Sequence, residues 1–296
     1  MFLVYLSLVG TRAMVTWNKK NEMAEYRCSC PHERHVLYKN MFKTTEITAY
    51  TIPSDNVIHQ RLLFAYYQTV KHVSGSILET GCGVGKGAEL FKPHCTHYTA
   101  LDKNQELINH LQKQHPEFTF LNQHIPPFAN QADESFDTVV TQQVIEHIED
   151  DNFYLKEIQR VLKKGGKMIL TTPNIKLSLT RNPWHVREYT AQELKTLLEK
   201  YFSKVDLKGI TGNEKIWEYY NQNKESVAKY KKLDIFNLEQ NLPRQILQIP
   251  YDILNRMNRK KLQEKDNSLV SSVTMDDYFI SDDADKCFDF FAVVEK

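Results

Sequence analysis

Short apolar runs alternate with amphipathic stretches over residues 57–211, and this alternation is the main structural signal in the chain. Apolar residues recur at helical spacing over 57–72, which predicts a helix. The apolar run at 76–81 has the length and composition of a buried strand. Residues 84–93 predict a second helix, which Pro93 ends because proline interrupts helical hydrogen bonding. The predicted order is therefore helix, strand, glycine-containing loop and helix.

The same order repeats further along the chain. Residues 97–102 predict a second strand, and 104–115 predict an amphipathic helix whose first residue, Asn104, is of the type that caps helix N-termini. A third strand is expected at 118–122. Later strands are expected at 136–143, 167–173, 204–210 and 287–295, and later helices at 153–163 and 190–202. This alternation predicts an α/β fold with a doubly wound, mostly parallel, seven-stranded sheet.

Residues 212–282 interrupt the alternation. They are rich in Asn, Gln, Lys and aromatic residues, and the stretches 216–233 and 244–262 have helical patterns. We interpret the segment as a helical insertion, or cap, before the last strand, and the run NRKK at 258–261 as a solvated helix face. The chain is then divided into an N-terminal extension at 1–56, an α/β core at 57–211, the insertion at 212–282 and a final core strand at 283–296.

Composition limits the classes of function. With 38 Lys+Arg against 37 Asp+Glu, the net charge of +1 does not favour binding to nucleic acid or to an anionic membrane. Five cysteines, an odd number, do not indicate a disulfide-rich secreted domain and favour the cytoplasm. The apolar opening MFLVYLSLVG lacks basic residues and is too short to span a bilayer. A leader or a buried strand is expected there, with a weak signal peptide as the less favoured alternative.

Four glycines, at positions 81, 83, 85 and 87, follow the first predicted strand. A glycine-rich turn between a strand and a helix lets a ligand approach backbone N–H groups at the helix N-terminus. Glycines needed only for tight packing are the alternative. The sequence has no GxxxxGK followed by Ser or Thr, which the phosphate-binding loop requires. The GxGxG spacing also differs from the GxGxxG pattern of dinucleotide sites.

The glycine loop, the stretch VIEHIED at 144–150 and the stretch LKKGGKMILTTPN at 162–174 resemble motifs of class I S-adenosylmethionine-dependent methyltransferases of the small-molecule type. The resemblance covers about residues 57–211 and the last strand. It implies a Rossmann-like methyltransferase fold, with S-adenosylmethionine as the cofactor and S-adenosylhomocysteine as the product.

The resemblance also implies the cofactor contacts. Glu79 matches the acidic residue that holds the amino group, and Asp102 matches the acidic residue that binds both ribose hydroxyls. Asn122 occupies a position where the family usually has Asp, and an amide oxygen can still accept a hydrogen bond from the adenine amino group. The expected cofactor-binding residues are Glu79, Gly81, Cys82, Gly83, Gly85, Asp102, Lys103, Asn122, Gln123 and Gln142.

His147 is the candidate catalytic residue, with His185 as the alternative base, because a histidine can remove the proton of an acceptor at neutral pH; a carboxylate or amine acceptor needs no such base. A local hydrogen-bonded pair with Glu146 is the alternative. His185, Arg187 and Tyr189 are expected at the rim of the pocket, where they pack or pair.

No metal site is assigned. The group Cys28, Cys30, His32 and His35 is compact in the sequence, but its spacing matches no known zinc site, so a solvated segment is the preferred interpretation.

The predicted function is methyl transfer from S-adenosylmethionine to an O or N atom of a small or medium-sized acceptor. The alternative is a non-catalytic, or differently catalytic, cofactor-binding module, because a fold does not fix its chemistry. A nucleic-acid acceptor is disfavoured, since the fourth strand leads into TQQVIEH and not into the (N/D/S)PP(Y/F) motif of DNA amino-methyltransferases. No membrane partner is expected, and the oligomeric state is left open.

Overall fold

The computed structural model describes residues 48, 52–232, 234 and 237–296, which belong to one compact unit. The expectations for the apolar opening and for the Cys28 to His35 group concern residues outside this description.

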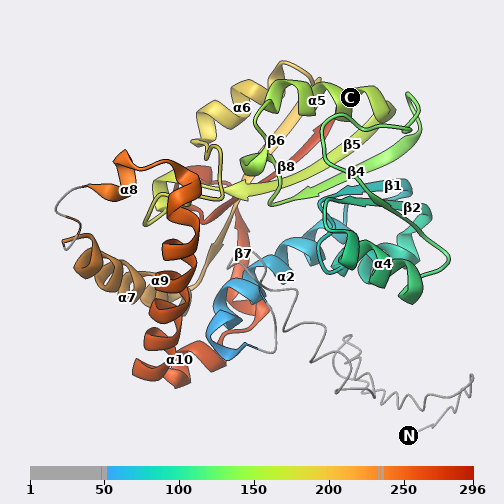
Figure 1. Ribbon diagram of the computed structural model, residues 1–296. Helices are drawn as coiled ribbons and strands as arrows, with labels where there is room; N and C mark the ends of the chain where they lie inside the picture. Colours follow the sequence, from blue (N-terminus) through green and yellow to red (C-terminus); the bar gives the residue numbers. More distant parts are fainter. Residues whose placement is uncertain (1–47, 49–51, 233, 235–236) are drawn as a thin grey trace, which may run out of the picture. The chain divides into compact units, whose positions relative to one another are not determined.

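One mixed sheet organises the described residues, with the strand order β3-β2-β1-β4-β5-β8-β6-β7 (Figure 1). The strands are β1 Gly75–Thr80, β2 Cys95–Asp102, β3 Thr119–Asn122, β4 Phe136–Gln142, β5 Leu162–Pro173, β6 Lys204–Gly212, β7 Tyr278–Ser281 and β8 Asp289–Glu295. The first five strands pair in parallel. Strand β8 pairs antiparallel with both β5 and β6, and β7 pairs antiparallel with β6 at the edge.

The predicted doubly wound, mostly parallel α/β fold is confirmed, but the predicted strand count is wrong. The sheet of the described residues has eight strands, because β7 lies inside the segment predicted to be a helical insertion. This strand has only four residues and pairs with the distant stretch Gly209–Gly212 of β6. So short a strand, with a partner far away in the sequence, leaves little local pattern to detect.

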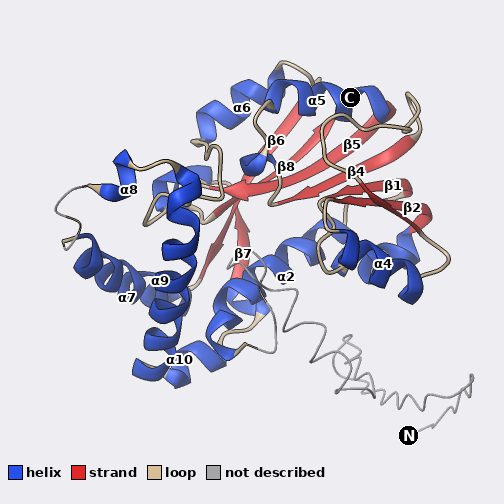
Figure 2. Ribbon diagram, in the orientation of Figure 1, coloured by secondary structure: helices blue, strands red, loops and turns tan. Residues whose placement is uncertain are grey.

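The sheet is covered on both faces because its central strands are apolar on both sides. Ile77 and Val140 belong to one buried cluster, while their chain neighbours Leu78 and Val139 belong to the other. The first cluster includes residues of α2, α3 and α4, and the second includes residues of α5 and α6 (Figure 2). These helices are α2 Asn56–Val70, α3 Lys86–Phe91, α4 Gln105–Gln114, α5 Asp151–Val161 and α6 Ala191–Glu199.

Side-chain caps satisfy backbone N–H groups at the N-termini of α4 and α6. The Asn104 side chain accepts hydrogen bonds from the backbone N–H groups of Glu106 and Leu107, which confirms it as the cap of α4. Thr190 and Glu193 form a reciprocal capping box at the start of α6. Short 3-10 helices complete the description: η1 Pro53–Asp55, η2 Lys92–His94, η3 Ile145–His147, η4 Ile175–Leu177, η5 Met275–Asp277 and η6 Ala284–Lys286.

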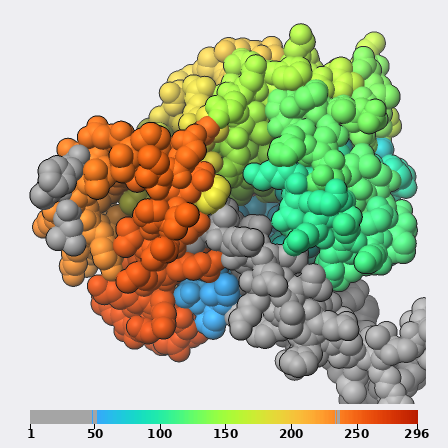
Figure 3. Space-filling model, viewed as in Figure 1, coloured from blue at the N-terminus to red at the C-terminus, as the bar shows by residue number. Residues whose placement is uncertain are grey.

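Between β6 and β7 lie four helices: α7 Glu214–Lys231, α8 Leu238–Asn241, α9 Arg244–Lys265 and α10 Asn267–Ser272. Figure 3 shows the orange surface of α8 and α9 beside the yellow and green surface of the core. The NRKK prediction is half wrong: Asn258 and Arg259 are buried, whereas Lys260 and Lys261 are exposed. Four consecutive residues cannot share one face of a helix, because each residue turns the side-chain direction by about 100°.

Among the described helices, none is long and apolar enough to cross a membrane.

Candidate cofactor and acceptor site

The glycine loop joins β1 to α3 and is fixed against the end of β2. The backbone N–H groups of Gly81 and Cys82 donate to the carbonyl oxygen of Leu101, at 2.7 and 3.2 Å. Gly81, Gly83 and Gly85 have φ angles of +66°, +49° and +80°, a left-handed backbone that favours glycine. The loop can therefore make its tight turn only with glycine-like residues.

The four glycines differ in what their missing side chains would meet. A Cβ at Gly81 would lie 2.6 Å from Cγ2 of Val144, and a Cβ at Gly85 or Gly87 would overlap Leu111 or Glu79 respectively. A Cβ at Gly83 would meet no atom within 4 Å. Tight packing thus explains three of these glycines, and Gly83 alone of the four borders open space.

Asp102, at the end of β2, faces this loop. Its Oδ2 accepts a hydrogen bond from the Gly83 N–H at 2.9 Å, and its Oδ1 accepts one from the Asn104 N–H at 2.8 Å. The residue is half-buried, and the side chain of Lys103 beside it is exposed. Each carboxylate oxygen can accept more than one hydrogen bond, so Asp102 retains acceptor capacity for a ligand.

Glu79 lies beneath the loop and is fully buried. The Tyr66 hydroxyl donates to its Oε1 at 2.7 Å, and the Tyr98 hydroxyl donates to its Oε2. Burial raises the pKa of the Glu79 carboxyl from 4.5 to about 7, and the two hydrogen bonds oppose that rise. The Glu79 carboxyl lies against Gly87 in the first turn of α3, where a Cβ would overlap its Oε2, and its contact with a cofactor amino group stays a prediction.

Three other predicted cofactor residues lie at the carboxyl ends of β3 and β4: Asn122 and Gln142 end these strands, and Gln123 follows β3. Asn122 is exposed and donates through Nδ2 to the carbonyl oxygen of Asp102 at 3.1 Å. Gln123 donates its backbone N–H to that carbonyl at 3.0 Å. Gln142 is buried, and its amide bonds to the hydroxyls of Thr69 and Thr171 at 2.9 and 2.8 Å. The amide of Gln142 therefore links α2 to β5.

A cavity of about 290 Å³ lies between the core and the insertion. The core side is formed by segments that follow β4 and β5, and the other side by α2, α7 and α9. Arg61 and Arg259 line it, each in an ion pair: Arg61 with Asp289 at 2.9 Å and Arg259 with Asp55 at 3.0 Å. Arg61 is not assigned a role from the sequence, and Arg259 is assigned only to the solvated run at 258–261, because the aspartate partners of both arginines are far away along the chain.

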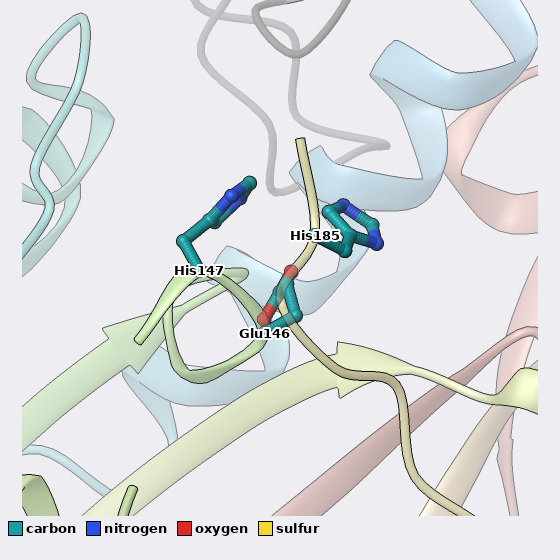
Figure 4. A group of neighbouring side chains, drawn as sticks. All are labelled: Glu146, His147 and His185. Carbon is teal, nitrogen blue, oxygen red and sulfur yellow. The ribbon is translucent and has the colours of Figure 1, made fainter. Parts of the chain in front are cut away.

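Glu146, His147 and His185 form a cluster in the wall of this cavity. Figure 4 shows Glu146 and His147 on the segment after β4 and His185 on the segment after β5. The two imidazole rings are 4.9 Å apart and nearly perpendicular. Glu146 is fully buried and accepts a hydrogen bond from the Thr172 hydroxyl at 2.9 Å.

The two other residues predicted at the rim have a structural partner in common. Arg187 and Tyr189 both donate to Oδ2 of Asp151, each at 2.9 Å. Tyr189 is buried, whereas about half of the Arg187 side chain is exposed. Pairing is therefore what the geometry supports for these two residues.

Residues 78–170 match the family model of the methyltransferase domain. A probable S-adenosylmethionine-dependent methyltransferase of Mycolicibacterium smegmatis is 33% identical over 162 residues, which are 53% of this chain and 63% of that protein. A ubiquinone biosynthesis O-methyltransferase of Coxiella burnetii is 28% identical over 102 residues, 33% of this chain and 43% of that protein. The YcgJ structure from Bacillus subtilis has 16% identity and a TM-score of 0.47, covering 80% of this chain and 98% of that one.

The fold, the glycine loop and the family match define a class I S-adenosylmethionine-dependent methyltransferase domain. This chain carries such a domain, and its cofactor is S-adenosylmethionine. The chain spans less than two thirds of the length of either curated relative.

Proposed function

We propose that this protein transfers the methyl group of S-adenosylmethionine to an O or N atom of a small or medium-sized acceptor held in the cavity. The observation that carries the proposal is the open space at Gly83, directly beside the Asp102 carboxylate. The cavity beside the same edge of the sheet supports the acceptor part of the proposal. We expect the reaction in a reducing cytoplasm, with neither nucleic acid nor membrane as a partner.

The residues at the loop fit the cofactor. Asp102 would accept the ribose hydroxyls, Asn122 and Gln123 would lie by the adenine, and Glu79 would lie on the side of the amino group. Gly81, Cys82, Gly83 and Gly85 would supply the backbone surface on which the cofactor rests. The bound cofactor supplies a methyl group already activated on a sulfonium, so the protein's main tasks are positioning and exclusion of water.

His147 is suited to receive a proton from the acceptor. Its Nδ1 lies 3.0 Å from the carbonyl oxygen of Trp184, which can only accept a hydrogen bond. Nδ1 therefore carries the hydrogen, and in the neutral ring Nε2 carries the lone pair. An acceptor hydroxyl would need such a base more than an amine would. The similarity to a ubiquinone O-methyltransferase favours an oxygen acceptor, although it covers only 33% of this chain.

The cofactor part is tested with a matched pair of glycine variants. Gly83 and Gly165 both have a left-handed backbone, and a Cβ at either position meets no atom within 4 Å. Alanine should strain both positions alike, by about 1 to 2 kcal/mol. Only Gly83→Ala should then weaken S-adenosylhomocysteine binding in calorimetry, by at least about 10-fold. Equal affinity of the two variants would contradict the proposed cofactor position.

The activity is tested by release of S-adenosylhomocysteine with panels of hydroxyl and amine acceptors. Acceptor-dependent release from the wild type that is strongly reduced by His147→Ala supports a base-assisted transfer. Binding of the cofactor without release for any acceptor class would favour the alternative, a cofactor-binding module without methyl transfer.

A further inference from the structure

We propose that Glu146, His147 and His185 together bind one divalent transition-metal ion in the cavity wall. One ligand atom of each of these residues lies within 4.8 Å of the others (Figure 4). The three come from two segments that follow the adjacent strands β4 and β5, so the sheet itself brings them together. No metal is expected from the sequence, because His185 lies 38 positions after His147 and the three residues match no linear metal motif.

Both histidines are held in the state that binds metals. Nδ1 of His147 lies 3.0 Å from the carbonyl oxygen of Trp184, and Nδ1 of His185 lies 2.7 Å from Oε1 of Glu188. A carbonyl and a carboxylate accept hydrogen bonds, so each Nδ1 is the donor and each neutral ring has its lone pair on Nε2. Metal-binding histidines in proteins commonly have this second hydrogen bond, which fixes the tautomer and the ring orientation.

A further contact supports the lone pair on His185. The amide Nδ2 of Asn182 lies 2.8 Å from its Nε2, and an amide N–H can only donate. Nε2 of His185 is therefore an acceptor in this structure. A metal ion would replace the amide N–H as the partner of Nε2, while the Asn182 Oδ1 keeps the hydrogen bond that it accepts from the Trp184 N–H at 3.0 Å.

The charges around the cluster also favour a cation. The arginines Arg61 and Arg259 of the same cavity are each matched by an aspartate. Glu146 is fully buried, and the side chain of Glu188 is only 10% exposed. The cluster thus places two carboxyl groups beside two imidazole rings in a region of low solvent access, and this set of oxygen and nitrogen donors suits a divalent cation.

The ligand set selects the kind of metal. Imidazole nitrogens suit Zn²⁺, Co²⁺, Fe²⁺ and Ni²⁺ better than Mg²⁺ or Ca²⁺, which prefer oxygen. Three protein ligands also leave coordination positions open to the cavity. When the metal is bound, Nε2 of His147 is a ligand and does not take the acceptor proton, so the metal replaces His147 in activating the acceptor. Resting on the proposed function, we infer that an acceptor hydroxyl occupies one open position, because a bound metal lowers the pKa of that hydroxyl, which then loses its proton to water before its oxygen takes the methyl group.

The test is a titration of the chelator-treated, full-length chain with CoCl₂ and with ZnCl₂. Cobalt is followed by its absorption spectrum and zinc by calorimetry. We expect one equivalent bound by nitrogen and oxygen ligands, and a loss of at least about 10-fold in affinity for His147→Ala and for His185→Ala. His115→Ala, which removes a half-buried histidine outside the cluster, should bind as the wild type does.

Two further measurements keep the result unambiguous. Cys28 and Cys30 could also bind cobalt, but thiolate ligands give a sulfur-to-metal charge-transfer band, and a Cys28→Ser/Cys30→Ser background removes them. Melting temperature and S-adenosylhomocysteine affinity, measured without metal, show whether each histidine variant is folded. No saturable binding, or equal binding by folded histidine variants, would overturn the metal site. Metal binding without methyl transfer to any acceptor would instead contradict the proposed function.

Discussion

The buried carboxyl group of Glu79 should make the stability of this protein depend on pH in an unusual direction. Burial raises its pKa from 4.5 to about 7. A difference of that size corresponds to about 3 kcal/mol between the protonated and ionised forms. In the unfolded chain the group ionises near its ordinary value, while the folded protein keeps the proton until about pH 7.

The sign follows from proton counting. Between pH 4.5 and about pH 7 the folded state binds a proton that the unfolded state has lost. The free energy of unfolding therefore falls as the pH rises through this window. His59 acts in the opposite direction: burial lowers its pKa from 6.5 to about 4, so its contribution to the free energy of unfolding is lost as the pH falls. The contribution of Glu79 is therefore obtained by comparing the wild type with a Glu79 variant, in which His59 is unchanged.

The perturbation is Glu79→Gln, which keeps the shape of the side chain and removes the titration. Urea unfolding of both proteins at several pH values between about 4.5 and 7 gives the free energies of unfolding. As the pH rises through this window, the free energy of unfolding of the wild type should fall by about 3 kcal/mol relative to that of Glu79→Gln. The exposed carboxyl of Glu106 provides the control variant, Glu106→Gln, which should show no such change. Parallel curves for wild type and Glu79→Gln would refute the reasoning.

Two further predictions concern charged side chains at the site. Asp102→Ala should weaken S-adenosylhomocysteine binding by about 2–4 kcal/mol in calorimetry, since charge-assisted hydrogen bonds are lost; unchanged affinity would remove Asp102 from the cofactor site. Arg259→Leu should lower the free energy of unfolding by about 3–5 kcal/mol, because it leaves the Asp55 carboxylate buried without its cation. The double variant with Asp55→Leu should recover much of that loss in urea unfolding, and equal losses in the single and double variants would contradict this explanation.

The sequence predicts the local elements of this fold well because their causes are local. The apolar run before Gly81 and the capping residue Asn104 act on their immediate neighbours, so strand β1 and the start of α4 are readable from a few residues. Strand β7 was missed because four residues gain their strand character only by pairing with β6, more than sixty positions earlier.

In the candidate site, too, features with local causes are predicted from the sequence and features that depend on distant residues are not. The spacing of the glycines indicates a ligand loop, but only the packing around each glycine separates Gly83 from the others. Arg259 looked like part of a charged surface run, and its burial depends on Asp55, which is 204 positions away. The metal-binding geometry around His185 likewise depends on the pairing of β4 with β5, which a linear motif does not encode.

The position of β8 has a consequence for biosynthesis. Residues 289–295 lie between β5 and β6, so both of those strands keep an open edge until this late segment has been synthesised and has left the ribosome. Exposed strand edges invite pairing with other chains. The parallel half of the sheet can form during translation, while the second half must wait for its central strand. In the nascent chain, the edges of β5 and β6 that face β8 therefore stay open to pairing with other chains until synthesis of β8 is complete.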